Sequence, residues 1–156
     1  MASSLNNVAS TVEGSRQALV TGSSSGIGLA IANALLYEGW RVIGLDVAAP
    51  SITHDQFQSV ALDLTDGAAV TKAALALADV DALVHAAGVL RVGNVGVLDH
   101  AGGELMWRIH VDAATRRADA LIPKMTATGK GRVVFIGSRV AGGMPGAISA
   151  ALVPAY

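Results

Sequence analysis

A glycine-rich turn between an apolar strand and an amphipathic helix constrains this chain more than any other feature. The turn lies between the apolar run of residues 18–21 and a stretch with apolar residues at helical spacing. Gly22 permits a tight exit from the strand, Gly26 lets backbone approach a pyrophosphate, and Gly28 allows the helix to pack against the sheet. This order of strand, glycine turn and helix predicts a dinucleotide-binding unit.

The start of the predicted helix completes the phosphate site. Free backbone amides at a helix N-terminus meet phosphate charge, and the serines of the turn add hydroxyl donors. We therefore expect the phosphate-binding residues to be Gly22, Ser24, Ser25, Gly26, Ile27 and Gly28. The alternative is a Gly/Ser-rich loop that only connects two elements.

An acidic residue at the end of the next strand favours the cofactor-binding interpretation. Asp46 closes the strand predicted over residues 41–46, where a carboxylate can accept a hydrogen bond from a ribose 2′-hydroxyl. No Arg or Lys occurs in the turn or directly after Asp46, so no side chain there would hold a 2′-phosphate. NAD is therefore favoured over NADP.

The rest of the chain continues the alternation of strands and helices. Further strands are predicted at residues 59–63, 81–85 and 132–136, with helices around residues 70–77 and 104–125 and a loop or short helix at 50–58. This pattern predicts an α/β fold with a doubly wound parallel sheet of the Rossmann type. We expect one such domain over residues 15–156, after a disordered arm at residues 1–14.

Composition excludes several classes of function. The 11 Lys and Arg nearly balance the 12 Asp and Glu, which argues against nucleic-acid or anionic-membrane partners. Hydrophobic residues make up 52% and charged residues 15%, which suggests a sheet buried on both faces or a subunit interface. No apolar stretch is long enough to cross a membrane, cysteine is absent, and His54 and His100 lack ligand-like neighbours. We expect a cytoplasmic protein without a metal site.

Several motifs in order resemble the short-chain dehydrogenase/reductase family, from about Gln17 through Gly142. The turn TGSSSGIG matches that family's TGxxxGIG spacing, and residues 131–138 resemble the strand that delivers its catalytic serine. The resemblance implies cofactor contacts beyond the turn at Asp63 and Leu64 after the third strand, and at Ala86, Ala87 and Gly88 after the fourth. His85 stands where the family usually has asparagine, and we expect it to be structural.

The resemblance also implies a reaction. Family members move a hydride between a nicotinamide and a secondary alcohol or carbonyl, using a tyrosine acid/base, a lysine, a serine and an asparagine in the long helix. By position the candidates are Ser138, Tyr156 and His110, the last in place of the asparagine. Ser138 could instead be an ordinary strand-end serine, and His110 a packed core residue.

The long helix of residues 104–125 resembles the family's usual subunit interface. We expect its stripe of apolar residues either to support a homodimer or homotetramer or simply to pack on the sheet. Arg116, Arg117 and Asp119 lie off this stripe, where we expect them to be solvated or at a subunit rim.

The lysine that follows the family's tyrosine is absent, because the sequence ends at Tyr156. We therefore expect a truncated family member that does not turn over alone. The alternatives are a half-domain that binds a dinucleotide or a partner without catalysis, and a non-functional remnant. Residues 86–93 also resemble NAD-dependent 2,3-dihydro-2,3-dihydroxybenzoate dehydrogenases, which implies a cyclic diol as substrate.

Overall fold

Five parallel strands form one sheet in the order β3-β2-β1-β4-β5. The computed structural model describes residues 16–138 apart from 78, 92–95 and 98. The strands are β1 (Gln17–Thr21), β2 (Arg41–Asp46), β3 (Phe57–Ala61), β4 (Ala82–His85) and β5 (Arg132–Phe135). The order reverses at β1, because the chain first proceeds outward to β3 and then returns to place β4 on the other side. Ligands of doubly wound sheets bind at this reversal, outside the carboxyl ends of the strands.

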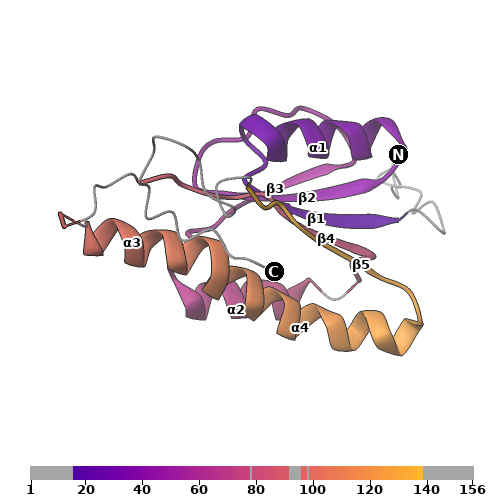
Figure 1. Ribbon diagram of the computed structural model, residues 1–156. Helices are drawn as coiled ribbons and strands as arrows, with labels where there is room; N and C mark the ends of the chain where they lie inside the picture. The colour runs from indigo at the N-terminus through magenta and orange to yellow at the C-terminus, as the bar shows by residue number, and fades with distance from the viewer. Residues whose placement is uncertain (1–15, 78, 92–95, 98, 139–156) are drawn as a thin grey trace, which may run out of the picture.

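Helices cover both faces of the sheet, which confirms the predicted fold class (Figure 1). One helix, α1 (Gly26–Tyr37), lies on one face. On the opposite face lie α2 (Gly67–Ala76), α3 (His100–Trp107), a π-helical turn η1 (Arg108–Asp112) and α4 (Ala113–Thr128).

The two faces form separate cores, because side chains alternate along each strand. Ala18 and Val20 pack toward α1, whereas Leu19 packs with Leu121 and Met125 of α4. A parallel sheet buried on both faces requires apolar residues at every position, which explains the unbroken apolar runs in the sequence.

The bounds of several elements differ from the prediction, and the structure shows the reason for two of them. The third strand runs from Phe57 to Ala61, two residues earlier than expected, because Phe57 pairs with Val42 and the chain turns at Asp63, whose carboxylate accepts the backbone N–H of Thr65 at 2.8 Å. The long helix begins at His100 rather than Glu104, because Asp99 caps it by accepting the backbone N–H of Gly102 at 2.9 Å.

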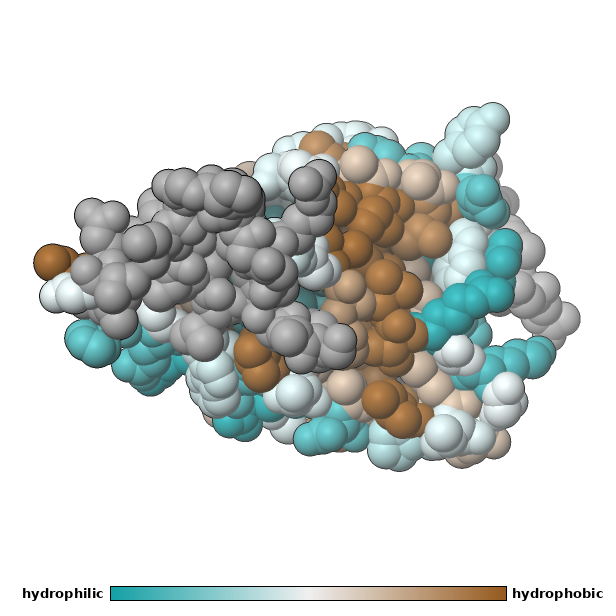
Figure 2. Space-filling view, viewed as in Figure 1, coloured by the Kyte–Doolittle hydropathy of each residue, from teal (hydrophilic) through white to brown (hydrophobic). Residues whose placement is uncertain are grey.

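The β5 edge of the sheet carries exposed apolar side chains. Figure 2 shows a band of hydrophobic residues between α1 and α4, over the side of the sheet where β5 lies. Val134 of β5 is 44% exposed and Ile136 just after it is 36% exposed. In the part of the chain that the structure describes, no helix is long and apolar enough to span a membrane.

Candidate cofactor-binding site

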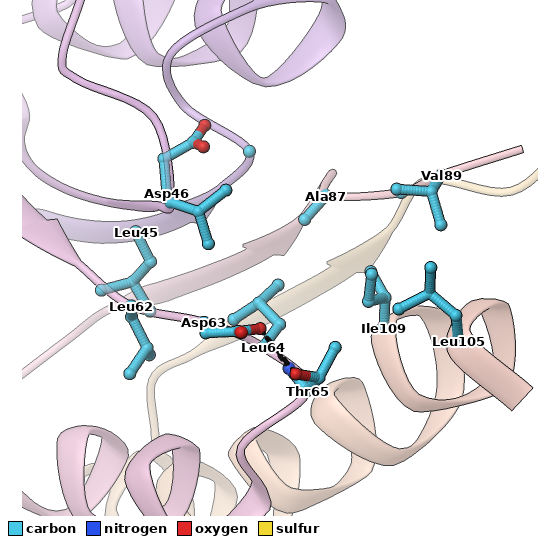
Figure 3. A pocket seen from close by; sticks show the side chains of 13 residues that line it. Leu45, Asp46, Leu62, Asp63, Leu64, Thr65, Ala87, Val89, Leu105 and Ile109 are labelled. Atoms are coloured by element: carbon cyan, nitrogen blue, oxygen red, sulfur yellow. Dashed lines mark hydrogen bonds between the residues drawn. The ribbon is translucent and has the colours of Figure 1, made fainter.

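A pocket of about 370 Å³ opens at the carboxyl ends of the strands, where the strand order reverses (Figure 3). Four separate stretches of chain that the sequence predicted to bind a cofactor meet around it. These are the turn after β1, the end of β2, the segment after β3 and the segment after β4. They contribute Gly22, Asp46, Asp63, Leu64, Ala87 and Gly88 to its lining.

The turn after β1 has room only for glycine at two positions. Gly22 has a φ of 70°, and a Cβ there would lie 2.8 Å from the Cα of Ala87. A Cβ on Gly28 would lie 2.1 Å from the carbonyl oxygen of Gly22. Because real Cβ atoms do not approach this closely, any side chain would push α1 or the segment after β4 out of place. The glycines therefore bring bare backbone together beside the pocket.

The N-terminus of α1 is left without a side-chain cap. Ser25 is the N-cap residue, and its side chain makes no capping hydrogen bond to the helix amides. The first helix amides have no partner within the helix, so they remain as donors for an anionic group. The exposed residues Ser25, Gly26 and Ile27 surround this helix start. The local structure suits a pyrophosphate.

The Ser24 hydroxyl has a structural role. It is buried and donates to the carbonyl oxygen of Ala48 at 3.3 Å, while the Ser24 carbonyl accepts the Ser51 hydroxyl at 2.8 Å. Ser23 is also buried and packs against Gly44. A Cβ added to Gly44 would lie 2.3 Å from the Ser23 hydroxyl oxygen. Of the three turn serines, only Ser25 is exposed to a ligand.

Asp46 ties the second strand to the turn. Its Oδ2 accepts the backbone N–H of Ser24 at 2.9 Å, and its Oδ1 accepts that of Ala48 at 3.0 Å. A carboxylate has about four acceptor positions, so two bonds fix its orientation and leave capacity for a ligand hydroxyl. No Arg, Lys or His is among the described residues that line the pocket. The charged side chains on the described pocket wall are therefore acidic.

Asp63 and Leu64 form the opposite wall, as Figure 3 shows. The Asp63 carboxylate accepts both the backbone N–H and the hydroxyl of Thr65 at 2.8 Å, and these bonds lower the pKa of Asp63 below its usual value. Leu64 is buried beside it. An ionised group and an apolar surface thus lie next to each other, as an adenosine moiety requires.

The segment after β4 is held from two sides. The Thr21 hydroxyl oxygen accepts the backbone N–H groups of Ala86 at 3.1 Å and Ala87 at 3.0 Å. On the other side, His110 Nε2 lies 3.0 Å from both the nitrogen and the carbonyl oxygen of Val89. One imidazole nitrogen accepts or donates, so it satisfies only one of these two groups at a time. His110 itself lies within the π-helical turn, a feature frequent at functional sites.

Arg117 lies neither in solvent nor at a subunit rim, so the prediction for this residue was wrong. It is fully buried, at 0% exposure, beneath the carboxyl end of β4, and its Nη2 lies 3.3 Å from His85 Nδ1. The other two residues of that prediction, Arg116 and Asp119, are exposed as expected. Helical periodicity alone places Arg117 one turn before the buried Leu121, but its charge argued against that position.

Two of the predicted catalytic residues, Ser138 and His110, are not among the described residues that line the pocket. Ser138 is exposed just after β5. His110 contacts the segment after β4 at the Val89 backbone. Tyr156 lies outside the described residues. Within the described part of the chain, no group of three or more His, Asp or Glu side chains is arranged to hold a metal ion.

Much of the pocket wall is apolar, and the sequence motifs do not predict it. Motif spacing identifies polar and glycine positions, whereas these residues look like ordinary strand-end and helix residues. Ile109 could have been predicted, because it directly precedes His110, which the family resemblance named as a catalytic candidate. The residues missed are Leu45, Val47, Leu62, Thr65, Val89, Leu105 and Ile109.

Curated relatives of this chain are dehydrogenases. It is 34% identical over 142 residues to the "short chain dehydrogenase andC" of Emericella variicolor, an alignment of 84% of this chain and 55% of that protein. It is 34% identical over 131 residues to the L-tagatose-forming galactitol 2-dehydrogenase of Cereibacter sphaeroides, covering 78% of this chain and 52% of that protein. The chain thus spans about half the length of these relatives.

Solved structures show the same fold. A short-chain dehydrogenase from Streptomyces avermitilis matches 81% of this chain and 50% of its own, with a TM-score of 0.73 and 34% identity. A short-chain dehydrogenase from Leptospira borgpetersenii, solved with bound NAD+, matches 83% of this chain and 54% of its own, with a TM-score of 0.76. At 20% identity, the latter likeness concerns the fold alone.

The family model "short chain dehydrogenase" matches residues 16–152, which is most of the chain. This match includes the glycine turn, the acidic end of β2 and the segment after β4 that meet at the pocket. The chain therefore belongs to the short-chain dehydrogenase/reductase family.

Proposed function

We propose that this chain is the NAD-binding domain of an oxidoreductase that transfers a hydride between the nicotinamide and a secondary alcohol or carbonyl. Residues 15–156 form this domain. The observation that carries the proposal is that Gly22 of the bare glycine turn and the Asp46 carboxylate line one pocket, with the uncapped start of α1 following in the same turn. When bound, the cofactor accepts or donates the hydride. The protein binds, orients and shields it.

Each part of the pocket suits one part of NAD. Gly22, Gly26 and the start of α1 would hold the pyrophosphate, and Asp46 the ribose hydroxyls. Asp63 and Leu64 would flank the adenine. The Ala86–Gly88 backbone would contact the nicotinamide half, on the side of the pocket nearest β4.

The choice of NAD over NADP rests on charge. A 2′-phosphate would face the Asp46 carboxylate without a basic side chain among the described pocket residues to neutralise it. Titration calorimetry with NADH and NADPH tests this choice. We expect NADH to bind at least about tenfold more tightly, a difference of about 1.4 kcal/mol. Equal affinity for both, or tighter NADPH binding, would reject the assignment.

For catalysis we propose Ser138 to orient the substrate oxygen, Tyr156 as the acid/base and His110 in the proton relay. Ser138 follows β5 at the same edge of the sheet as the pocket, because the carboxyl ends of parallel strands lie together. In a longer chain that supplies the family's lysine, Ser138→Ala should lower kcat by about a hundredfold while leaving NADH affinity unchanged. Ser59→Ala, at an exposed serine of β3, is the matched control. A Ser138 variant with full kcat would remove this residue from the mechanism.

A second candidate is a dinucleotide-binding half-domain without catalysis. The observations that favour it are His85 and His110, which stand at two positions where the family usually has asparagine. NADH binding without turnover of any secondary alcohol or cyclic diol, in a longer chain that supplies the family's lysine, would support this alternative over the first proposal.

We also propose that the protein is a homo-oligomer, with α3 and α4 at the interface. Trp107 and Ile122 are 46% and 42% exposed on these helices, which is unfavourable for a free surface. Sedimentation velocity tests this proposal, and Ile122→Asp should shift the protein to monomer. The cyclic diol remains the proposed substrate class.

A further inference from the structure

The protonation of His85 is coupled to the hydrogen bonds that its neighbour Thr21 makes. A threonine hydroxyl has one hydrogen and two acceptor lone pairs. The N–H groups of Ala86 and Ala87 occupy the two acceptor positions. The hydroxyl hydrogen must then point to His85 Nδ1, which lies 3.1 Å from Thr21 Oγ1. His85 therefore accepts at Nδ1, and its own proton is on Nε2, a buried atom without a hydrogen-bond partner among the described residues.

A second donor reaches the same nitrogen from the helical layer. Arg117 Nη2 lies 3.3 Å from His85 Nδ1, and a guanidinium group only donates. If Nδ1 carried a proton, it would face both this donor and the Thr21 hydroxyl, whose lone pairs are taken. Arg117 thus excludes the Nδ1–H tautomer and the doubly protonated ring.

Burial and the nearby charges also favour the neutral form of His85. Among the described residues, the charged or titratable groups that act on it are Arg117 of α4 and His110 of η1, and no carboxylate is among them. From the neighbouring strands it meets Thr21 of β1 and Phe135 of β5, which do not titrate at ordinary pH. Burial, followed by the charges of Arg117 and His110, lowers the pKa of His85 to about 3, with the Ile109 carbonyl opposing.

Arg117 is not held there by an ion pair. Burial lowers its pKa to about 10, so it is a cation at neutral pH. Its Nε and Nη1 have no hydrogen-bond partner among the described residues, and its Nη2 bonds to His85. A buried cation without a carboxylate is costly to maintain, so a role beyond packing is needed to explain it.

We propose that Arg117 is a positioning residue that fixes His85 as the neutral Nε2–H tautomer, and that His85 in turn orients the Thr21 hydroxyl that holds the Ala86–Ala87 backbone. Arg117 would act on cofactor binding through two intermediate side chains, without contact to the ligand. The effect on cofactor affinity rests on the proposed NAD site, whereas the tautomer itself does not depend on it.

The direct test is nitrogen-15 NMR of the histidine rings in the full chain without cofactor. We expect His85 in the wild type to remain the neutral Nε2–H tautomer from pH 8 to pH 5.5. In Arg117→Met, which keeps an unbranched side chain of similar length, the pKa of His85 should rise and the Nδ1–H tautomer should become populated. Hydrogen exchange at the Ala86 and Ala87 amides should accelerate at least about tenfold, as expected when one hydrogen bond is lost. Arg117→Lys keeps the charge and should retain the wild-type tautomer.

Cofactor binding provides the second readout. Arg117→Met should weaken NADH binding about tenfold at pH 7, and more at lower pH. Adding His85→Asn should restore affinity to within about twofold, because the asparagine oxygen accepts from Thr21 and has no tautomers. A role in packing alone would not be rescued by this second substitution.

The outcomes separate this inference from the proposed function. If the wild type does not bind NADH, the proposed function fails, and the NMR experiment still decides the role of Arg117. An Arg117→Met protein with the wild-type tautomer and affinity would overturn the inference. If that variant does not fold, the wild-type spectrum decides alone, since an Nδ1–H or charged His85 at pH 6 would be incompatible with it.

Discussion

The Asp46 carboxylate accepts the backbone N–H of Ser24 at 2.9 Å, so the end of β2 fixes the turn that follows β1. The same side chain is the proposed ribose contact. It therefore orders the unliganded turn and offers its remaining acceptor capacity to a ligand. This dual role means that substitutions at Asp46 affect both the turn and the cofactor.

Asp46→Ala should weaken NADH binding at least about tenfold, because a charge-assisted hydrogen bond contributes about 1.5–3 kcal/mol. Titration calorimetry measures the change. Asp55→Ala, at an exposed aspartate in the turn before β3, is the matched control and should leave affinity unchanged. Unaltered NADH affinity in Asp46→Ala would mean that the ribose contact lies elsewhere.

Gly28→Ala should destabilise the protein by about 2 kcal/mol or more and abolish NADH binding, because the new Cβ would lie 2.1 Å from the carbonyl oxygen of Gly22. Gly103→Ala in α3 is the control, since no atom lies within 4 Å of its new Cβ. Removing a helix-interior glycine should stabilise the protein by about 0.5–1 kcal/mol. Urea denaturation measures the free energy of unfolding of both variants. Equal changes in this free energy would show that the close contact at Gly28 is relieved.

Stability should fall in acid through His85. Burial is the main cause that lowers its pKa to about 3, whereas an unfolded histidine titrates near 6.5. Above pH 6.5 the ring is neutral in both states and contributes no pH dependence. Between pH 6.5 and 3 the unfolded state binds a proton that the folded state does not, so the free energy of unfolding falls by about 1.4 kcal/mol per pH unit.

The comparison of wild type with His85→Asn isolates this contribution. Urea denaturation at pH 7, 5.5 and 4.5 should show a steeper loss in the wild type than in the variant. Parallel curves would show that His85 becomes protonated in the folded state.

His110→Asn should retain stability within about 0.5 kcal/mol, because one amide group can accept from the Val89 nitrogen and donate to its carbonyl oxygen at once. His110→Ala should cost about 1 kcal/mol, since the bond to Val89 at 3.0 Å is lost without replacement. Thermal denaturation compares the two variants. A destabilised asparagine variant and an unaffected alanine variant would show that the imidazole packs without a hydrogen-bonding role.

The glycine turn, the fold class and the position of Asp46 could be predicted because each is encoded locally. Backbone atoms lie so close to Gly22 and Gly28 that only glycine fits at these positions. This requirement appears in the sequence as a recognisable spacing of glycines. The alternation of apolar runs and helical stripes likewise reflects a sheet covered on both faces. Such features depend on neighbours in the chain.

Arg117 could not be predicted, because its environment is made by residues distant in sequence. Its position follows the helical stripe toward Leu121, but only the packing of α4 against β4 brings it to His85. The apolar pocket wall has the same origin, since Leu105 and Ile109 reach the pocket from the layer opposite α1. No spacing rule links them to the turn.

The doubly wound fold and its cofactor turn follow from the order of residues, because glycine geometry and apolar periodicity are local constraints on the backbone. Which side chains meet at the carboxyl ends of the strands, and which of their nitrogens carry protons, depends on how distant segments pack together. The hydrogen bonds among Thr21, His85 and Arg117 join a strand, its neighbour and a helix. Donor and acceptor roles in such a network are set by three-dimensional proximity, which the order of residues does not contain.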